Sequence, residues 1–363
     1  MRKILFLLFI YCIQGGCKSP GHSGYVQFQA LEKDQTGLDF NNKLIPTEQF
    51  NVLKYMYFYN GGGVGAGDFN NDGLLDLFFA GNQVQNSLYL NKGNLHFRNV
   101  TREANIPNDS GWSTGVSVVD INNDGLLDIY ICRVGNHETL HSHNQLLICQ
   151  RIDKNGVPIY KDEAAAYGLN FSGFSTQAVF FDYDMDGDLD MYLLNHSIHQ
   201  NGTFGRRAEK LMTYNPLSGD RLYRNNGDHT FSDVTGKSGI HSSVIGYGLG
   251  VEAADIDLDG YPDLYVGNDF HEDDYLYINQ GNGKFIDRLN EKIMHTSQYT
   301  MGVDIGDLNN DGYPEIVSMD MLPSDPFILK KSLGEDEEDI FNLKIGYGYN
   351  YQYTRNNLQF NRR

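Results

Sequence analysis

The nonapeptide Asp68–Asp76 (DFNNDGLLD) decides the fold expected of this chain, because the sequence spells its pattern five times. Every copy has an oxygen-bearing side chain at positions 1, 3, 5 and 9 and a glycine at position 6. The other copies are Asp120–Asp128 (DINNDGLLD), Asp182–Asp190 (DYDMDGDLD), Asp255–Asp263 (DIDLDGYPD) and Asp307–Glu315 (DLNNDGYPE). Successive copies begin 52 to 73 residues apart, so they mark repeating structural units rather than a chance acidic run.

These acidic loops carry the oxygen ligands of a hard-cation site. Calcium takes about six to eight oxygens in a flexible shell, and four side chains, a backbone carbonyl near position 7 and a water supply them. The glycine lets the chain turn sharply around the ion. We therefore predict about five Ca²⁺ ions with a structural role. The predicted ligands are Asp68, Asn70, Asp72, Asp76, Asp120, Asn122, Asp124, Asp128, Asp182, Asp184, Asp186, Asp190, Asp255, Asp257, Asp259, Asp263, Asp307, Asn309, Asp311 and Glu315.

The loops are not EF-hands. An EF-hand closes with an acid at position 12 and lies between two helices, whereas position 12 here is Phe79, Ile131, Leu193, Val266 or Ser318. The flanking segments are short β-branched and aromatic runs, such as GVSVVDI before a loop and LDIYICR after it. Such runs are typical of β-strands.

Each repeat predicts four antiparallel strands. The acidic loop joins the first two, a third ends in Asn and a turn, as in DRLYRNNGD (220–228), and a fourth follows, as in TFSDVTGKSGI (230–240). Four-stranded units of this length are typical of β-propeller blades, whereas solenoid repeats are usually shorter. We expect an all-β protein, a β-propeller of four-stranded antiparallel blades. The five blades are expected at about 58–109, 110–170, 171–240, 241–294 and 295–363.

The two ends of the chain do not form whole repeats. Residues 17–57 are expected to be a tether and a closing strand, because 26–44 read like a fourth strand with its tail. The last unit ends on YQYTRNNLQFN (351–361), which aligns with third strands. Either the N-terminal strand completes this blade in a five-bladed ring, or the chain is the front part of a larger, truncated propeller. We favour the second alternative.

The composition limits the classes of partner. The 363 residues carry a formal charge of −19, and the loops account for much of the acidity. Nucleic acid is not expected as a partner, because phosphate binding needs a basic surface. Aromatic residues make up 13% of the chain and there are 40 glycines, which suits strands joined by tight turns.

The N-terminus reads as an export signal. Arg2 and Lys3 precede the apolar run Ile4–Ile13, which is too short to span a membrane as a helix. Small residues before Cys17 suggest a lipoprotein-type signal over 1–16, with Cys17 as the lipidated first mature residue. Plain secretion is the alternative. We expect an outer-membrane lipoprotein, or a periplasmic or cell-surface protein, of a bacterium.

Two cysteines remain in the predicted mature domain. Cys132 falls at the end of a second strand and Cys149 at the end of a third. Those ends of a hairpin lie far apart, whereas a disulfide needs Cα atoms within about 7 Å. We predict that both thiols are unpaired.

The five loops and the glycine-containing strands before them resemble the FG-GAP/VCBS repeats of integrin-like propellers. The resemblance covers about residues 58–363 and implies calcium in the loops. Within that family the chain is similar to bacterial exported proteins that also carry a C-terminal ASPIC/UnbV domain. DMLPSDP (320–326) and NDFHEDDYLYIN (268–279) suggest this, and no ASPIC/UnbV domain lies in these residues.

The face opposite the acidic loops is the candidate ligand site. Connections between second and third strands lie there, and three are long: Val134–His143, Asn195–Gly219 and Met321–Tyr349. Long polar loops on a rigid scaffold often carry function. The alternatives are a ligand-binding face, a metal held by His and carboxylate, or ordinary solvated loops. The candidate ligand-binding residues are His137, His141, His143, His196, His199, Arg206, His271 and Asp273.

We therefore predict an exported, calcium-binding β-propeller that acts as a binding or adhesion module for a protein or glycan ligand. One alternative is a polysaccharide-active hydrolase or lyase that uses the His, Arg and carboxylate groups of the same face. Another is a structural part of a larger surface protein. Fold resemblance alone does not choose among them.

Overall fold

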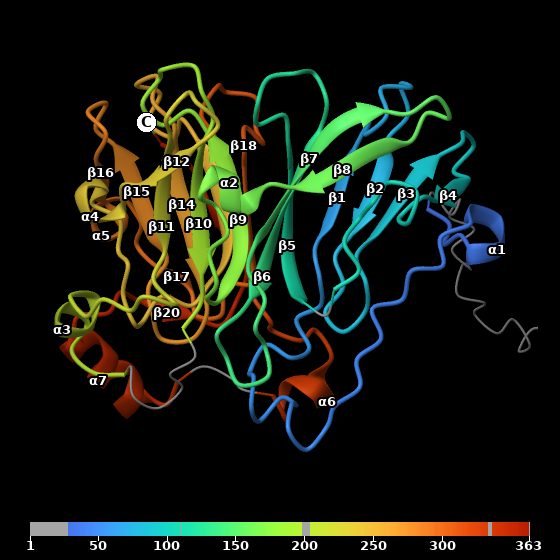
Figure 1. Ribbon diagram of the computed structural model, residues 1–363. Coiled ribbons are helices and arrows are strands. Elements are labelled where there is room, and N and C mark those ends of the chain that lie inside the picture. Colours follow the sequence, from blue (N-terminus) through green and yellow to red (C-terminus); the bar gives the residue numbers. More distant parts are fainter. Residues whose placement is uncertain (1–27, 110, 198–203, 333–335, 363) are drawn as a thin grey trace, which may run out of the picture.

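The computed structural model describes residues 28–109, 111–197, 204–332 and 336–362 (Figure 1). The predicted signal 1–16, the predicted anchor Cys17 and the candidate His199 lie outside these residues. Within the described part of the chain, none of the helices has the length and apolarity needed to cross a bilayer.

The strands form successive antiparallel sheets, each with its strands in chain order, as expected of propeller blades. Blade 1 is β1 (Val64–Gly67), β2 (Asp76–Phe79), β3 (Ser87–Asn91) and β4 (Phe97–Asn99). Blade 2 is β5 (Trp112–Val119), β6 (Asp128–Val134), β7 (Gln145–Ile152) and β8 (Pro158–Asp162). Blade 3 is β9 (Ser175–Phe181), β10 (Asp190–Asn195), β11 (Arg221–Asn225) and β12 (Phe231–Asp233). Blade 4 is β13 (Gly248–Ala254), β14 (Asp263–Asn268), β15 (Tyr275–Asn279) and β16 (Phe285–Asp287).

Blade 5 differs from the others. Its sheet contains β18 (Gly302–Gly306), β19 (Glu315–Met319) and β21 (Asn357–Gln359), and no fourth strand among the described residues. The short strands β17 (Thr296–Ser297) and β20 (Gln352–Tyr353) pair in parallel beside it. The helices are short: α1 (Lys33–Thr36), α2 (Ala164–Tyr167), α3 (Arg207–Leu211), α4 (Thr235–Ser238), α5 (Leu289–Lys292), α6 (Pro326–Leu329) and α7 (Glu338–Tyr347).

The core lies between the blades, because successive side chains of a strand point to opposite faces of its sheet. Tyr130 of β6 packs toward blade 3, and its neighbour Ile131 packs toward blade 1. The same alternation separates the two cysteines: Cys132 belongs to the apolar cluster shared with blade 3, and Cys149 to the one shared with blade 1. Both thiols are free and buried, which confirms the prediction, and the sheet itself keeps them apart.

A tail follows each of the first three blades and rests on the outer strand of the next blade. Gly239, at the end of α4, has φ +85° and lies so close to the Phe285 carbonyl that a Cβ would collide with it. Gly168, with φ +77°, faces the Phe231 carbonyl less closely, since a Cβ there would lie 3.2 Å from the oxygen. At Gly239 only glycine meets both conditions without strain.

The N-terminal segment corrects one expectation. No strand forms in the described part of 26–44; residues 28–32 are irregular, and α1 with Gly37 (φ +77°) forms a tail that lies against Phe97 of blade 1. The expected fourth strand is therefore absent from these residues, although its tail is present. A strand needs a partner edge, and α1 lies at the far side of the molecule from blade 5 (Figure 1).

The innermost strands pack side by side from blade to blade: β1 on β5, β5 on β9, β9 on β13 and β13 on β18. No comparable packing joins β1 to β18 within the described residues, and Val64 of β1 is 59% exposed. The five blades therefore form an open series with two end faces.

Candidate functional site

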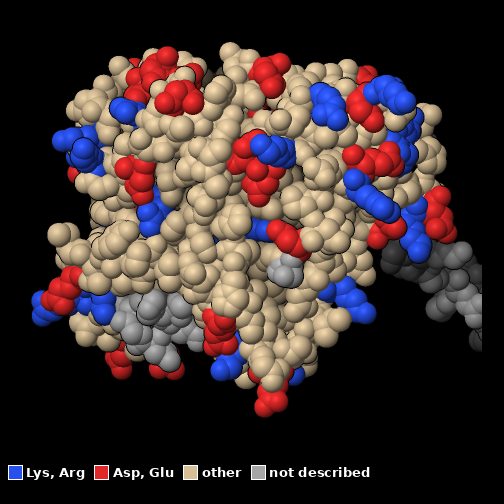
Figure 2. Space-filling view, in the orientation of Figure 1, with Lys and Arg blue, Asp and Glu red and all other residues tan. Residues whose placement is uncertain are grey.

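The five acidic loops share one backbone conformation. The residue at position 4 has a φ between +55° and +62°, and the glycine at position 6 has a φ between +82° and +96°. The position-4 residues are Asn71, Asn123, Met185, Leu258 and Asn310. All five loops join first to second strands, at the upper edge of Figure 1. Figure 2 shows acidic side chains gathered along that edge.

The carboxylate at position 1 is held by the backbone of its own loop. Asp68 accepts the N–H of Asp72 at 3.0 Å on Oδ1 and the N–H of Gly73 at 2.7 Å on Oδ2. Asp120, Asp182, Asp255 and Asp307 accept the same two bonds. The loop thus fixes where its first carboxylate points.

The carboxylate at position 9 is buried and ties the loop to two strands. Asp76 accepts the N–H of Phe69 at 3.0 Å and the N–H of Asn91, at the end of the third strand, at 2.7 Å. Burial, reinforced by the neighbouring loop carboxylates, raises the pKa of Asp76 to about 6 and that of Asp128 to about 7. A buried carboxylate beside other carboxylates favours a nearby cation.

Two loops bring three carboxylates together. Oxygens of Asp182, Asp184 and Asp190, and likewise of Asp255, Asp257 and Asp263, lie within 4.8 Å of one another and could hold a metal ion. In the first group Oδ1 of Asp184 is buried and accepts no hydrogen bond within the described structure. An unpaired buried carboxylate oxygen fits the role of a cation ligand.

The remaining loops have Asn at position 3, so an amide oxygen replaces one carboxylate. The fifth loop differs most, because Asn309 turns its amide toward Glu315 and donates to Oε1 at 3.0 Å. The longer Glu side chain reaches across the loop. The donor set still consists of oxygens, which suits a hard cation.

On the opposite side, residues 44–58 cross the ends of blades 2 to 4 and form a small aromatic core there. Phe50, Tyr55 and Phe58 pack on Trp112 of blade 2. Tyr55 also reaches His196 of blade 3, with 3.0 Å between its hydroxyl and Nε2. Burial lowers the pKa of His196 to about 4, so this imidazole is a neutral core group.

A buried group of charged side chains, the ionic group, lies on the same side. Arg207 of α3 contacts Glu272 at 2.9 Å and Asp273 at 3.0 Å, and all three side chains are buried. Asp273 also accepts the backbone N–H of Asn350 at 2.9 Å. Burial raises the pKa of Glu272 to about 8 against the opposing effect of Arg207. The group ties α3, the β14–β15 connection and the end of the long blade 5 insertion together.

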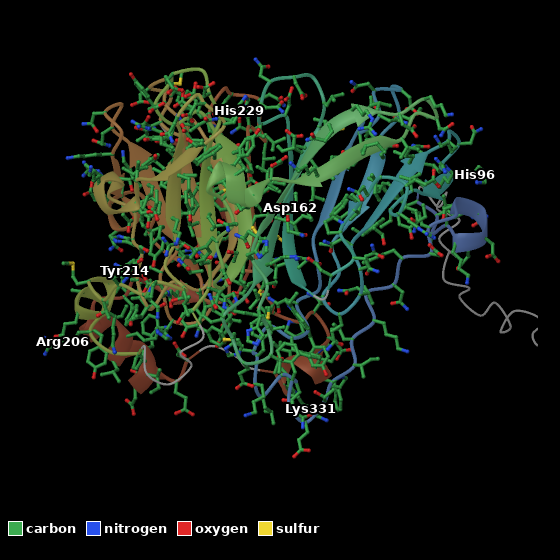
Figure 3. The ribbon with its side chains drawn as sticks, viewed as in Figure 1. His96, Asp162, Arg206, Tyr214, His229 and Lys331 are labelled. Carbon is green, nitrogen blue, oxygen red and sulfur yellow. The ribbon has the colours of Figure 1, made fainter. Side chains whose placement is uncertain are left out.

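The structure divides the predicted ligand-binding residues into three sets. His137 and His196 both adjoin Tyr55 in the aromatic core. His271 and Asp273 lie at the ionic group, where His271 packs on Tyr349. The exposed set is His141, His143 and Arg206, and Arg206 points away from the molecule in Figure 3.

Sequence reasoning missed the role of Tyr55 and Tyr57, because it treated 17–57 as a tether. Tyr57 donates to Asp269 at 3.0 Å, and burial raises the pKa of Asp269 to about 6. The signal was the aromatic run FNVLKYMYF (50–58), which fits no repeat position and which a solvated tether would not contain.

Comparison with known proteins agrees with the loop geometry. A family model described as FG-GAP-like repeat matches residues 68–131, 206–266 and 255–318. The chain contains FG-GAP-like repeats. Among curated proteins, cartilage acidic protein 1 of Mus musculus is 25% identical to this chain over 288 residues. The aligned region covers 76% of this chain and 42% of that protein. The chain thus spans less than half the length of that relative.

Three solved structures that are similar to this chain have TM-scores below 0.5. An Agrocybe aegerita lectin that recognises non-reducing terminal N-acetylglucosamine has 17% identity and a TM-score of 0.41, over 70% of this chain and 59% of that chain. The biofilm matrix protein Bap1 of V. cholerae has 15% identity and a TM-score of 0.31, over 70% and 34%. The Photorhabdus luminescens Tc holotoxin pore has 13% identity and a TM-score of 0.34, over 70% and 10%.

Proposed function

We propose that this protein is an exported, calcium-stabilised β-propeller that acts as a binding or adhesion module for a protein or glycan. The observation that supports it best is the repetition of one loop conformation five times, with a buried carboxylate at position 9 of each. A scaffold pinned by ions along one edge leaves the opposite loops to vary for recognition.

Calcium would act by neutralising carboxylates that the fold forces together. An ion that binds only the folded state adds about 2.7 kcal/mol of stability at a hundred times its dissociation constant. The test is a thermal melt of the chain in calcium and in excess chelator, with bound metal counted by atomic emission. About five ions and a large fall in melting temperature on chelation are expected. Equal melts and no bound calcium would refute the metal proposal.

The recognition surface would be the side that carries the long second-to-third-strand connections. Its exposed candidates are His141, His143 and Arg206, whereas Glu272 and Asp273 are fully buried. Buried carboxylates offer no reacting group to a polysaccharide, so we favour binding over hydrolysis. The test is a glycan array and a bacterial-surface pull-down with the triple alanine variant of the exposed residues. The matched control is His96→Ala, at a turn on the acidic-loop side.

Loss of ligand in the triple variant, with an unchanged melting temperature and a binding-competent control, is the expected outcome. Equal binding by all three proteins would move the site elsewhere. The anchor has its own test, since Cys17→Ser is expected to release the protein from the membrane fraction. Retention of that variant in the membrane fraction would contradict lipidation at Cys17.

A further inference from the structure

The second-to-third-strand connections of three blades meet at the ionic group. Blade 3 contributes Arg207, blade 4 contributes Glu272 and Asp273, and blade 5 contributes Asn350. The helices α3 and α7 lie side by side there, at the lower left of Figure 1. The fold therefore gathers side chains from three distant parts of the sequence around one point.

A stack of aromatic rings lies next to the ionic group. Phe204 stacks on Tyr349, with 6.0 Å between the ring centroids and 7° between the planes. Phe204 also contacts Tyr347, the last residue of α7, at 5.6 Å, and His271 packs edge-on against Phe204 and Tyr349. Tyr349 is buried, whereas Phe204 is 36% exposed and Tyr347 is half-buried. The two outer rings therefore present an aromatic surface to solvent beside Arg207.

Several buried polar atoms of this place form no hydrogen bond within the described structure. They include Oε2 of Glu272, Oε1 of Gln352 and Nδ2 of Asn350. Turning the Gln352 amide round would not help, because its Nε2 already donates to the carbonyl of Glu272 at 2.8 Å and to Oδ1 of Asp273 at 3.1 Å. Folded proteins rarely leave buried polar atoms unpaired. Two acceptors and one donor in one place therefore point to a polar ligand.

The packing leaves room beside Tyr275. Gly246 is buried, yet among the described residues a Cβ at this position would approach only the Tyr275 hydroxyl, at 3.8 Å. A close-packed interior would place neighbours on several sides of such a position. Burial and the charge of Glu272 raise the pKa of Tyr275, so the tyrosine borders the ionic group. The room and the unpaired polar atoms thus belong to the same place.

We propose that this place is a subsite for a neutral saccharide, an inference that rests on the binding function proposed above and names a glycan as its ligand. A sugar ring offers a C–H face to the rings of Phe204 and Tyr347. Its hydroxyls both donate and accept hydrogen bonds, which suits the acceptors of Glu272 and Gln352 and the donor of Asn350. Two buried carboxylates beside one guanidinium disfavour an acidic sugar. A peptide would need a groove or a strand edge instead.

Saturation-transfer NMR of the whole chain in calcium tests the subsite, with neutral tetrasaccharides of glucose, N-acetylglucosamine, mannose and galactose as probes. At least one of them is expected to bind wild type. Tyr347→Ala removes a ring face and is expected to weaken that binding at least about tenfold, whereas Tyr347→Phe keeps the ring and is expected to retain it. The matched control is Tyr59→Ala, which removes a tyrosine that is 62% exposed elsewhere on the chain and is expected to bind like wild type.

Glu272→Gln tests the polar part of the subsite, because it keeps the shape of the side chain and exchanges the unpaired acceptor for a donor. It is also expected to weaken binding at least about tenfold, and circular dichroism checks the fold of each variant. Sugar binding that neither Tyr347→Ala nor Glu272→Gln weakens would overturn the subsite and leave the proposed binding function standing.

Binding of none of the four sugars would overturn the subsite as well. The pull-down with the triple alanine variant of His141, His143 and Arg206 then decides the wider proposal. A protein ligand that wild type captures and the triple variant loses would keep the binding function without a glycan. Capture of neither class of ligand by wild type would end both proposals.

Discussion

At the scale of single residues, two of the acidic loops contain a strained side chain. Met185 and Leu258 stand at position 4 with φ +60° and +62°, where the other loops have Asn. Left-handed backbone costs most residues about 1–2 kcal/mol, and Asn tolerates it. Both side chains are about half exposed, so replacing them removes little packing.

Met185→Asn and Leu258→Asn are therefore expected to stabilise the protein by about 0.5–1 kcal/mol each. Urea denaturation in calcium measures the free energy of unfolding. The reverse change, Asn123→Leu, serves as control and is expected to destabilise by a similar amount. If all three variants unfold like wild type, backbone strain at position 4 is not significant.

His196 makes the stability depend on pH. Its pKa falls from 6.5 to about 4 on burial, so below pH 6.5 the unfolded chain takes up a proton that the folded chain does not. Stability is lost as pH falls from about 6.5 to 4, by up to roughly 3 kcal/mol from this group. His196→Gln, which still can bond Tyr55, is expected to flatten this part of the profile, and exposed His96→Gln is not. Identical pH profiles for wild type and His196→Gln would contradict this.

At the scale of elements, the acidic loops could be predicted from sequence in detail because the hydrogen bonds from position 1 to the backbone of positions 5 and 6, which set the turn, lie within nine residues. The N-terminal segment could not, because 44–58 gains its structure from Trp112, His196 and Asp269 on three different blades. The candidate site shows the same division. The loop carboxylates could be predicted because they belong to a short repeated motif. The burial of His196 or Asp273 depends on a segment far away in the sequence.

Replacing Asp184 tests the loops, because the expected change in melting temperature differs between calcium and chelator. Burial and the adjacent Asp186 and Asp182 raise its pKa, so the carboxylate is unfavourable without an ion. Asp184→Ala is expected to lower the melting temperature in calcium, with one ion fewer bound, and to leave it equal or higher in chelator. A loss of stability of the same size in both conditions would indicate a structural role without metal.

The ionic group around Arg207 has a matched control in the neighbouring residue. Arg207→Met leaves Glu272 and Asp273 buried without their cation, at a cost of about 3–5 kcal/mol. Arg206→Met changes an exposed side chain and is expected to cost little. Adding Glu272→Gln to Arg207→Met is expected to recover part of the loss in urea denaturation. Equal stability of the two single variants would show that the ion pairs contribute nothing.

At the scale of the whole molecule, repeated sequence predicted the blades and their order, but not how the ends meet. Blade packing follows from alternating side chains within each repeat, so neighbouring blades obey a local rule. Whether β1 meets β18 depends on the summed angles of all five blades and on what lies against Leu358 and Val64. No short segment encodes that sum.

The net charge adds a property that no single loop has. With a formal charge of −19, the acidic side chains repel one another. Five bound Ca²⁺ would reduce the net charge to about −9. In chelator the melting temperature is therefore expected to rise with potassium chloride between about 20 and 500 mM, because salt screens the repulsion. In calcium the rise is expected to be much smaller, since the ions already neutralise the most crowded carboxylates. Parallel salt dependences would mean that the repulsion is spread over the surface rather than concentrated in the loops.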